Sequence, residues 1–403
     1  MGRQAPPEKG ENVEGRPFDM AKRLKGLPPY LFAELDRLKQ AEIKKGVDVI
    51  PLGIGDPDQP TPENIVQAMH RAIDRKENHH YPSYEGMPAF REAAAGWFQD
   101  RFGVTLDPDQ EVVTLIGSKE GIGHFPLAFV DPGDVVLVPD PGYPVYEIGT
   151  LLAGGVPYFM PLTRENGFLP DLRAIPHDIL RKARIIFLNY PNNPTAAVAS
   201  RGFFDKVVRF AMENRLIVCH DAAYTEIFYD GGKPMSFLEA DGALDVGIEF
   251  HSLSKTYNMT GWRIGFAAGS AQLIQGLGKI KTNLDSGIFQ AIQEAGIEAL
   301  SEDQSSVEKM RAMYQERRDT FVAGLRDAGL SCDPPRATFY LWMEVPKGYT
   351  SGTFCEFLLK RAGIAATPGN GFGKSGEGYI RFTLTVSKER LAEAAERIKG
   401  VLR

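Results

Sequence analysis

Short apolar runs alternate with longer stretches of helical periodicity from about residue 110 to residue 270. The runs are apolar on both faces, which is typical of buried parallel strands. They lie at residues 112–116, 135–138, 156–159, 185–188, 216–219, 248–250 and 264–267. This alternation predicts an α/β fold, in which helices sandwich a mostly parallel seven-stranded sheet.

The pattern changes after about residue 290. A long helical region is followed by a strand at 338–345, a helix at 354–361, a strand at 379–384 and a terminal helix. We therefore predict a large domain over residues 56–290 and a smaller α+β domain over residues 291–403, which the N-terminal segment 18–55 joins. Residues 1–17 are polar and rich in Gly, Pro and charge, and predict a disordered arm.

The N-terminal segment holds two features of interest. A helical pattern runs from Tyr30 to Gly46, and the simplest role for Tyr30 is to pack this segment against the fold. A short strand is expected at 47–52, and the loop after it contains Gly53 and Gly55. Glycine in such a loop permits a positive φ or lets a ligand approach the backbone, but most such loops are ordinary turns.

Composition restricts the class of protein. The 403 residues are 43% hydrophobic and 24% charged, as in soluble globular proteins, and they exceed the size of one ordinary core. The formal net charge of -6 gives no indication of nucleic-acid binding. No apolar run is long enough to span a bilayer, and the N-terminus has no signal-peptide pattern. Three widely spaced cysteines favour reduced thiols, so we expect a cytoplasmic protein.

Unusual polar residues follow four of the predicted strands. Ser118 and Lys119 follow the first strand, Asn193 follows the fourth, Asp221 follows the fifth, and residues 252–255 follow the sixth. In open α/β sheets, ligands bind at the carboxyl ends of the strands. We therefore expect these residues to meet at one ligand site.

The residue types at this edge suggest a carbonyl cofactor with a phosphate. A neutral Lys255 amine can form a Schiff base with pyridoxal phosphate, and Asp221 can stabilise a protonated ring nitrogen. Ser118 lies at a predicted helix N-terminus, which is a ready anion site. Taken one at a time, a surface lysine and a capping carboxylate are the more common explanations.

Other residues fit the same cofactor. Ser252, Ser254 and Arg263 offer hydrogen-bond donors to a phosphate. Asn193 and Tyr224 can bond the phenolic oxygen of the ring, although Asn193 also suits a rigid turn. Tyr143 can stack on the ring or belong to an aromatic turn. The adjacent histidines at 79 and 80 have no third ligand at suitable spacing, so we expect no metal site.

Five motifs in order resemble those of the fold-type I, pyridoxal-phosphate-dependent aminotransferases of class I and II. They are the segments 189–195, 221–224, 252–255, 261–265 and 379–382, and the resemblance extends from about residue 24 to the C-terminus. The resemblance implies the pyridoxal-phosphate transferase fold, an amino acid and a keto acid as substrates, and no membrane partner.

The resemblance also assigns roles to individual residues. The catalytic residues are Lys255, which forms the Schiff base and moves protons, with Asp221 and Tyr224. The implied cofactor-binding residues are Tyr81, Ser118, Lys119, Tyr143, Asn193, Asp221, Tyr224, Ser252, Ser254, Lys255 and Arg263. The implied substrate-binding residues are Tyr30, Gly55, Lys119, Tyr143, Asn193 and Arg381, of which Arg381 binds the α-carboxylate. Tyr81 matches a tyrosine that reaches the neighbouring subunit's phosphate, which implies a homodimer with shared active sites.

The segments 27–32, 52–58, 81–86 and 116–121 resemble more closely the subgroup that acts on LL-diaminopimelate in lysine biosynthesis. The expected reaction transfers an amino group between LL-2,6-diaminopimelate and 2-oxoglutarate. Related enzymes that act on alanine, aspartate or other amino acids share many of these residues, and so do β-lyases of the same fold. A regulatory protein with this fold would need a basic DNA-binding module, and the chain before the fold is too short for one.

Overall fold

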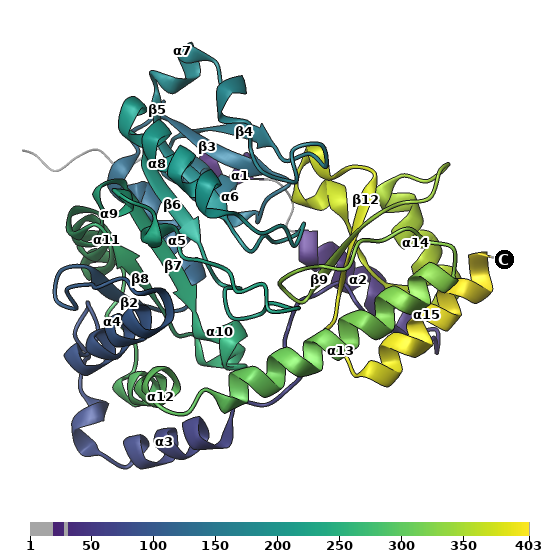
Figure 1. Ribbon diagram of the computed structural model, residues 1–403, viewed down its shortest axis with the longest axis horizontal. Coiled ribbons are helices and arrows are strands. Elements are labelled where there is room, and N and C mark those ends of the chain that lie inside the picture. The colour runs from purple at the N-terminus through teal and green to yellow at the C-terminus, as the bar shows by residue number, and fades with distance from the viewer. Residues whose placement is uncertain (1–18, 28–30, 403) are drawn as a thin grey trace, which may run out of the picture.

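The structure is a computed structural model, and it describes residues 19–27 and 31–402. Its central element is a seven-stranded sheet (Figure 1). The strands are β2 (Val112–Leu115), β3 (Val135–Asp140), β4 (Val156–Pro161), β5 (Ala183–Asn189), β6 (Ile217–Asp221), β7 (Gly247–Ser252) and β8 (Gly265–Gly269). Their order is β2-β8-β7-β6-β5-β3-β4. Only β8 runs antiparallel to its neighbours, so the prediction of a mostly parallel sheet is confirmed.

Helices cover both faces of this sheet because its strands are apolar on both faces. Helices α5 (Ser118–Phe129), α6 (Val145–Leu152) and α11 (Ala271–Leu284) pack on one face. Helices α4 (Pro88–Phe102), α8 (Arg201–Asn214), α9 (Ala243–Val246) and α12 (Gln290–Ser301) pack on the other. Neighbouring strand residues point alternately to the two faces of the sheet: Val135 and Leu137 pack on one face, Val136 and Val138 on the other.

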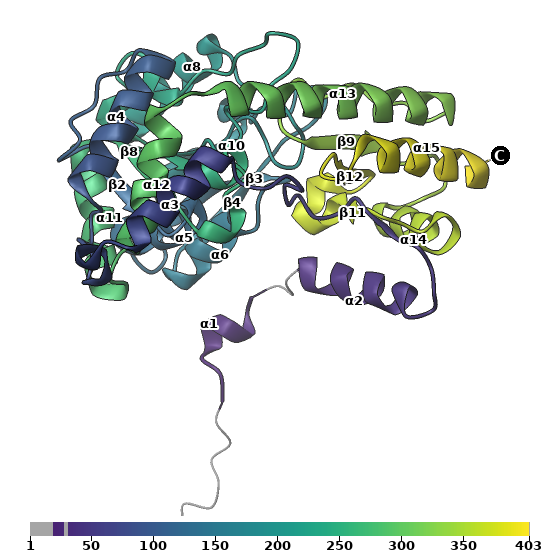
Figure 2. The ribbon, with the colours of Figure 1, turned by 90° about the horizontal axis from the view of Figure 1, so that it is seen from below.

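A separate core, called the second core below, lies beside the sheet and the helices that cover it. It contains the antiparallel sheet β11-β12-β9, the short parallel pair β1-β10, and three helices. Figure 2 shows helix α13 running from the side of α12 past β9 and along α15. The elements of this region are β1 (Ile50–Pro51), α13 (Ser305–Asp327), β9 (Tyr340–Glu344), α14 (Ser351–Ala362), β10 (Ile364–Ala365), β11 (Thr367–Pro368), β12 (Tyr379–Thr383) and α15 (Lys388–Leu402). The strand expected at 47–52 is thus only two residues long.

Five further α-helices belong to the described chain, which also contains six short 3-10 helices. The α-helices are α1 (Lys22–Lys25), α2 (Leu31–Ile43), α3 (Glu63–Ile73), α7 (His177–Leu180) and α10 (Leu253–Thr256). Tyr30 and the arm predicted at residues 1–17 lie outside the described residues. No helix in the described ranges combines the length and the apolar composition that crossing a membrane requires.

Candidate active site

A cavity of about 290 Å³ lies where the carboxyl ends of β5, β6 and β7 face the second core. Its lining comes from segments that are far apart in the sequence. The lining residues are Ile54, Gly55, Ser118, Lys119, Tyr143, Asn193, Asp221, Ala223, Tyr224, Ser252, Ser254, Lys255, Arg263, Tyr340 and Arg381. The polar residues that were expected to meet at the strand ends therefore do line one pocket.

Lys255 reaches the pocket from α10, the short helix that follows β7. Its Nζ donates a hydrogen bond to the carbonyl oxygen of Gly55 at 3.3 Å. Burial lowers the pKa of Lys255 to about 8; the Asp56 carboxylate opposes this shift, and the positive charges of Arg263 and Arg381 add to it. Roughly a fifth of this amine is therefore neutral near physiological pH, far more than for an ordinary lysine, and the neutral form is the one that a nucleophile or general base requires.

Asp221 ends β6 and is buried. Its Oδ2 accepts a hydrogen bond from the hydroxyl of Tyr146 at 2.7 Å, whereas its Oδ1 has no partner among the described residues. Burial raises the pKa of Asp221, and the hydrogen bond from Tyr146 opposes that shift. A buried carboxylate oxygen without a donor is costly, so this geometry suits a ligand that brings a cationic N–H group.

The opposite end of the pocket has the properties of an anion site. Ser118 opens the twelve-residue helix α5, whose first backbone N–H groups have no intrahelical acceptor. Ser252 and Ser254 lie beside it, and Arg263 Nη1 donates to Ser254 Oγ at 3.4 Å. A Cβ on Gly117 would lie 2.4 Å from Arg263 Nη2, so glycine is required for the guanidinium to lie there.

Arg381 projects from β12 and is almost completely buried. Its Nη1 donates to Asn193 Oδ1 at 2.6 Å and its Nη2 donates to the Gly53 carbonyl oxygen at 2.7 Å. The rings of Tyr340 and Phe372 lie 4.1 and 4.6 Å from the guanidinium carbon. These contacts fix the plane of the guanidinium, which is the requirement for bidentate binding of a carboxylate.

Tyr224 follows Asp221 by three residues and is a buried member of the second core. Its hydroxyl is 3.0 Å from the hydroxyl of Tyr340, and burial raises its pKa well above the usual range. A Cβ on Gly55 would lie 2.3 Å from the Tyr340 hydroxyl oxygen. Gly55 is therefore needed so that Tyr340 can reach Tyr224.

Three residues with implied ligand contacts differ in their placement. Lys119 and Tyr143 both line the pocket, with Lys119 Nζ 6.0 Å from the centre of the Tyr143 ring. Tyr81 lies outside the pocket and is 90% exposed. Its expected contact is with a neighbouring subunit, so this role stays a prediction.

Some residues of the site were not identified from the sequence. Tyr146 and Tyr340 hydrogen-bond Asp221 and Tyr224 across sequence separations of 75 and 116 residues. Gly117, directly before Ser118, is needed for the position of Arg263. Its position at the turn between a strand and a helix was a usable signal, whereas no local pattern marks the two tyrosines.

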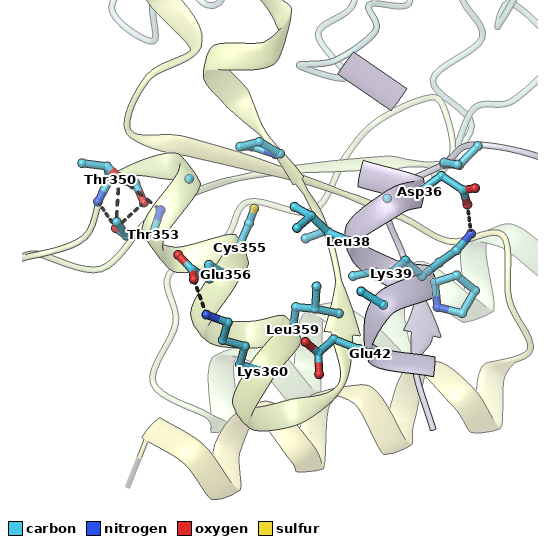
Figure 3. Close-up of a pocket in the computed structure, with 18 of the residues that line it drawn as sticks. Asp36, Leu38, Lys39, Glu42, Thr350, Thr353, Cys355, Glu356, Leu359 and Lys360 are labelled. Atoms are coloured by element: carbon cyan, nitrogen blue, oxygen red, sulfur yellow. Dashed lines mark hydrogen bonds and ion pairs between the residues drawn. The ribbon is translucent and has the colours of Figure 1, made fainter. Parts of the chain in front are cut away.

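A larger cavity of about 810 Å³ lies between α2 and α14. Figure 3 shows charged side chains at its edge, and those of Asp36 and Lys39 form an ion pair of 2.6 Å. Glu356 likewise pairs with Lys360 on α14. Because these charges neutralise one another on their own helices, they do not converge on a ligand, and we assign the chemistry to the smaller pocket.

A family model described as aminotransferase class I and II matches residues 47–398. The chain therefore belongs to the class I and II aminotransferases and is an enzyme that transfers amino groups. The family expected from the five sequence motifs is confirmed.

The chain is 59% identical over 382 residues to a protein of Syntrophobacter fumaroxidans named LL-diaminopimelate aminotransferase, which covers 95% of this chain and 98% of the relative. It is also 59% identical over 384 residues to a protein of the same name from Aquifex aeolicus, covering 95% and 99%. Among solved structures, substrate-bound BacF from Bacillus subtilis has a TM-score of 0.92 at 39% identity, covering 95% and 97%. An aminotransferase from Staphylococcus aureus has a TM-score of 0.89 at 35% identity, covering 95% and 99%. These structures support the predicted fold.

Proposed function

We propose that the chain is a pyridoxal-phosphate-dependent aminotransferase that moves an amino group between LL-2,6-diaminopimelate and 2-oxoglutarate. The observation that carries the proposal is the pairing in one pocket of a lysine of lowered pKa with a buried carboxylate oxygen that has no donor among the described residues. The name shared by relatives at 55–59% identity supports the choice of amino donor. This reaction belongs to lysine biosynthesis, for which we expect a cytoplasmic enzyme.

The residues of the pocket fit pyridoxal phosphate from end to end. Asp221 Oδ1 is available to a protonated ring nitrogen, and the N-terminus of α5 with Ser252, Ser254 and Arg263 is available to the phosphate. Lys255 lines the same pocket and would hold the aldehyde carbon. When bound, the cofactor supplies an electron sink for the charge that develops at the amino acid's α-carbon.

The remaining steps are performed by side chains of the chain itself. Arg381 would hold the substrate's α-carboxylate, which fixes the α-carbon near Lys255. Lys255 would then act as general base and take the proton from the substrate's α-carbon. It would next act as general acid and give this proton to the carbon that was the cofactor's aldehyde carbon. Asn193 and Tyr224 would donate hydrogen bonds to the phenolic oxygen of the ring. Lys119 would bind the distal carboxylate, since a second carboxylate needs a second cation.

We further propose a homodimer with shared active sites, in which Tyr81 reaches the phosphate of the neighbouring subunit. Tyr81 is 90% exposed in the single chain, so its hydroxyl is accessible to a neighbouring subunit. Substitution of Tyr81 by phenylalanine should weaken cofactor retention in the dimer. Mixed dimers that contain one Tyr81→Phe subunit and one inactive subunit would show which active site loses affinity.

The experiment that tests the function is a half-reaction assay. The chain is loaded with pyridoxal phosphate, and the conversion of its absorbance to that of the amine form is followed with LL-diaminopimelate, alanine, aspartate and glutamate separately. We expect LL-diaminopimelate and glutamate to convert the cofactor with the highest kcat/KM. Faster conversion by alanine or aspartate would overturn the assigned donor. Release of pyruvate and ammonia without an added keto acid would indicate a β-lyase.

A further inference from the structure

Behind the pocket, on the opposite face of the sheet, lies a buried polar cluster of His220, Glu249 and His251. Their exposed fractions are 0%, 0% and 4%. His220 directly precedes Asp221 in β6, and side chains of neighbouring strand residues point to opposite faces. Glu249 and His251 belong to β7, the strand that leads to Lys255. The cluster therefore lies under the two strand ends that hold the main catalytic groups.

The hydrogen bonds of the cluster define the protonation of His220. The backbone N–H of Tyr190 donates to His220 Nε2 at 3.2 Å, so this nitrogen is the acceptor. The other nitrogen, Nδ1, lies 2.8 Å from Glu249 Oε2. A carboxylate only accepts hydrogen bonds, so His220 Nδ1 must hold the proton and donate it to Glu249.

Glu249 is held in this role by two further donors. The backbone N–H of Phe237 donates to Oε2 at 2.8 Å, and His251 Nε2 lies 2.6 Å from Oε1. Three donors thus converge on the two oxygens of this buried carboxylate, and hydrogen bonds to a carboxylate favour its ionised form. Glu249 therefore stays an ionised acceptor, and it keeps His220 in one tautomer.

The consequence is a chain of contacts across three neighbouring strands. Tyr190 follows the last residue of β5, His220 lies in β6 and Glu249 lies in β7. On the pocket side, Asn189 Nδ2 donates to the backbone oxygen of Asp221 at 2.7 Å. The backbone of Asp221 is thus held from both sides, next to a carboxylate oxygen that must meet the cofactor.

We propose that His220 is a positioning residue for Asp221, which Glu249 locks in the tautomer with its proton on Nδ1. By joining the ends of β5, β6 and β7, His220 fixes the direction of the Asp221 carboxylate toward the ring nitrogen of pyridoxal phosphate. The inference rests on the proposed function of the pocket. It predicts that cutting either contact of His220 weakens cofactor binding even where the fold is retained.

Two substitutions separate the contacts of His220. In His220→Asn, the amide nitrogen takes the place of Nδ1 and keeps the bond to Glu249, but the acceptor for Tyr190 N–H is lost. In His220→Gln, the amide oxygen takes the place of Nε2 and keeps the Tyr190 bond, but the donor to Glu249 is lost. We expect each variant to raise the dissociation constant of pyridoxal phosphate at least tenfold. Hydrogen exchange of the Tyr190 amide in the apo chain should accelerate in His220→Asn and not in His220→Gln.

The matched control is Glu226→Gln. Glu226 is also a buried carboxylate, but its partner is Arg101, at 2.7 Å, and neither residue belongs to the His220 cluster. We expect this variant to lower the melting temperature of the apo chain without changing the dissociation constant of pyridoxal phosphate. If the His220 variants behave in the same way as this control, the role of His220 is structural only and the inference is wrong.

A measurement on the unmodified chain tests the tautomer whether or not the variants fold. Labelling with ¹⁵N-histidine should give, for His220 in the apo chain, the shifts of an imidazole protonated on Nδ1 only. A proton on Nε2 would overturn the inference. Failure of the unmodified chain to bind pyridoxal phosphate would refute the proposed function, whereas equal binding by the unmodified chain and both variants would refute only the role of His220.

Discussion

Tyr146→Phe is the substitution that tests the cofactor assignment with the smallest change to the fold. It removes one hydroxyl group, which donates to Asp221 Oδ2 at 2.7 Å and is completely buried. The ring itself stays, stacked on Phe187 with centroids 5.0 Å apart, so no large cavity forms. The variant therefore isolates a single hydrogen bond to the carboxylate that we expect to face the ring nitrogen.

The size of the effect follows from the type of hydrogen bond. A hydrogen bond to a charged group contributes about 1.5–3 kcal/mol. Asp221 Oδ1 has no partner in the described chain, so the carboxylate has few other donors to compensate. The bond is also present in the chain without cofactor, so this energy is an upper bound on the loss of binding; since each 1.4 kcal/mol is tenfold in affinity, the dissociation constant of pyridoxal phosphate should rise by up to roughly 150-fold.

The direction of the pH dependence also follows. Burial raises the pKa of Asp221 and the Tyr146 hydrogen bond lowers it, so the variant's carboxyl has the higher pKa. The carboxylate binds the cationic ring only when ionised, and this contribution is lost as the pH falls through the pKa of Asp221. As the pH is lowered, the cofactor affinity of Tyr146→Phe should therefore begin to fall at a higher pH than that of the unmodified chain.

The assay is a titration of the apo chain with pyridoxal phosphate, followed by absorbance at several pH values. The control is Tyr229→Phe, which removes a buried hydroxyl that donates to the Thr338 carbonyl oxygen at 2.6 Å in the second core. We expect the control to lose stability without losing cofactor affinity. An unchanged dissociation constant in Tyr146→Phe would show that Asp221 does not bind the cofactor's charge.

Three further substitutions and one pH profile test other parts of the site. Lys255→Ala should still bind pyridoxal phosphate but lose turnover by several orders of magnitude and yield no borohydride-trapped cofactor; normal turnover would exclude Lys255. Because the pKa of Lys255 is about 8, covalent capture of pyridoxal phosphate by the apo chain should accelerate with pH and level off above about pH 8, whereas an increase that continues toward pH 10 would contradict the lowered value. Arg381→Lys should lower kcat/KM about 100-fold or more, because an ammonium cannot bind a carboxylate with the paired geometry of a guanidinium; a loss below threefold would exclude this role. Gly55→Ala should lower kcat/KM at least tenfold because its Cβ would lie 2.3 Å from the Tyr340 hydroxyl, while Gly278→Ala, where nothing lies within 4 Å, should leave it unchanged.

Much of the candidate site could be predicted from the sequence because its main residues follow strands. The runs before Asn193, Asp221 and Lys255 are short and apolar, and such runs form the interior of a parallel sheet. The carboxyl ends of parallel strands meet at one edge, so the order of residues along the chain was enough to place them near one another. The antiparallel direction of β8 was not predicted, since an apolar run gives no information on strand direction.

The partners of these residues depend on contacts between segments that are distant in the sequence. Tyr146 lies on a helix and Tyr340 on a strand of the second core, and both have the apolar surroundings of ordinary core residues. Their hydroxyls acquire a role only because the fold places Asp221 and Tyr224 within hydrogen-bond reach. No spacing along the chain gives this information.

The sequence by itself determined the fold class, and it predicted the strand ends at which Asp221 and Lys255 lie. These follow from apolar periodicity and from local strand ends, which depend on neighbouring residues alone. Only the tertiary structure decided that Asp221 has one bonded and one unbonded oxygen, that Gly55 makes room for Tyr340, and that His220 accepts a bond from Tyr190. A hydrogen bond forms or fails on differences of a few tenths of an ångström in the distance between donor and acceptor. These distances are set by the packing of all the elements together.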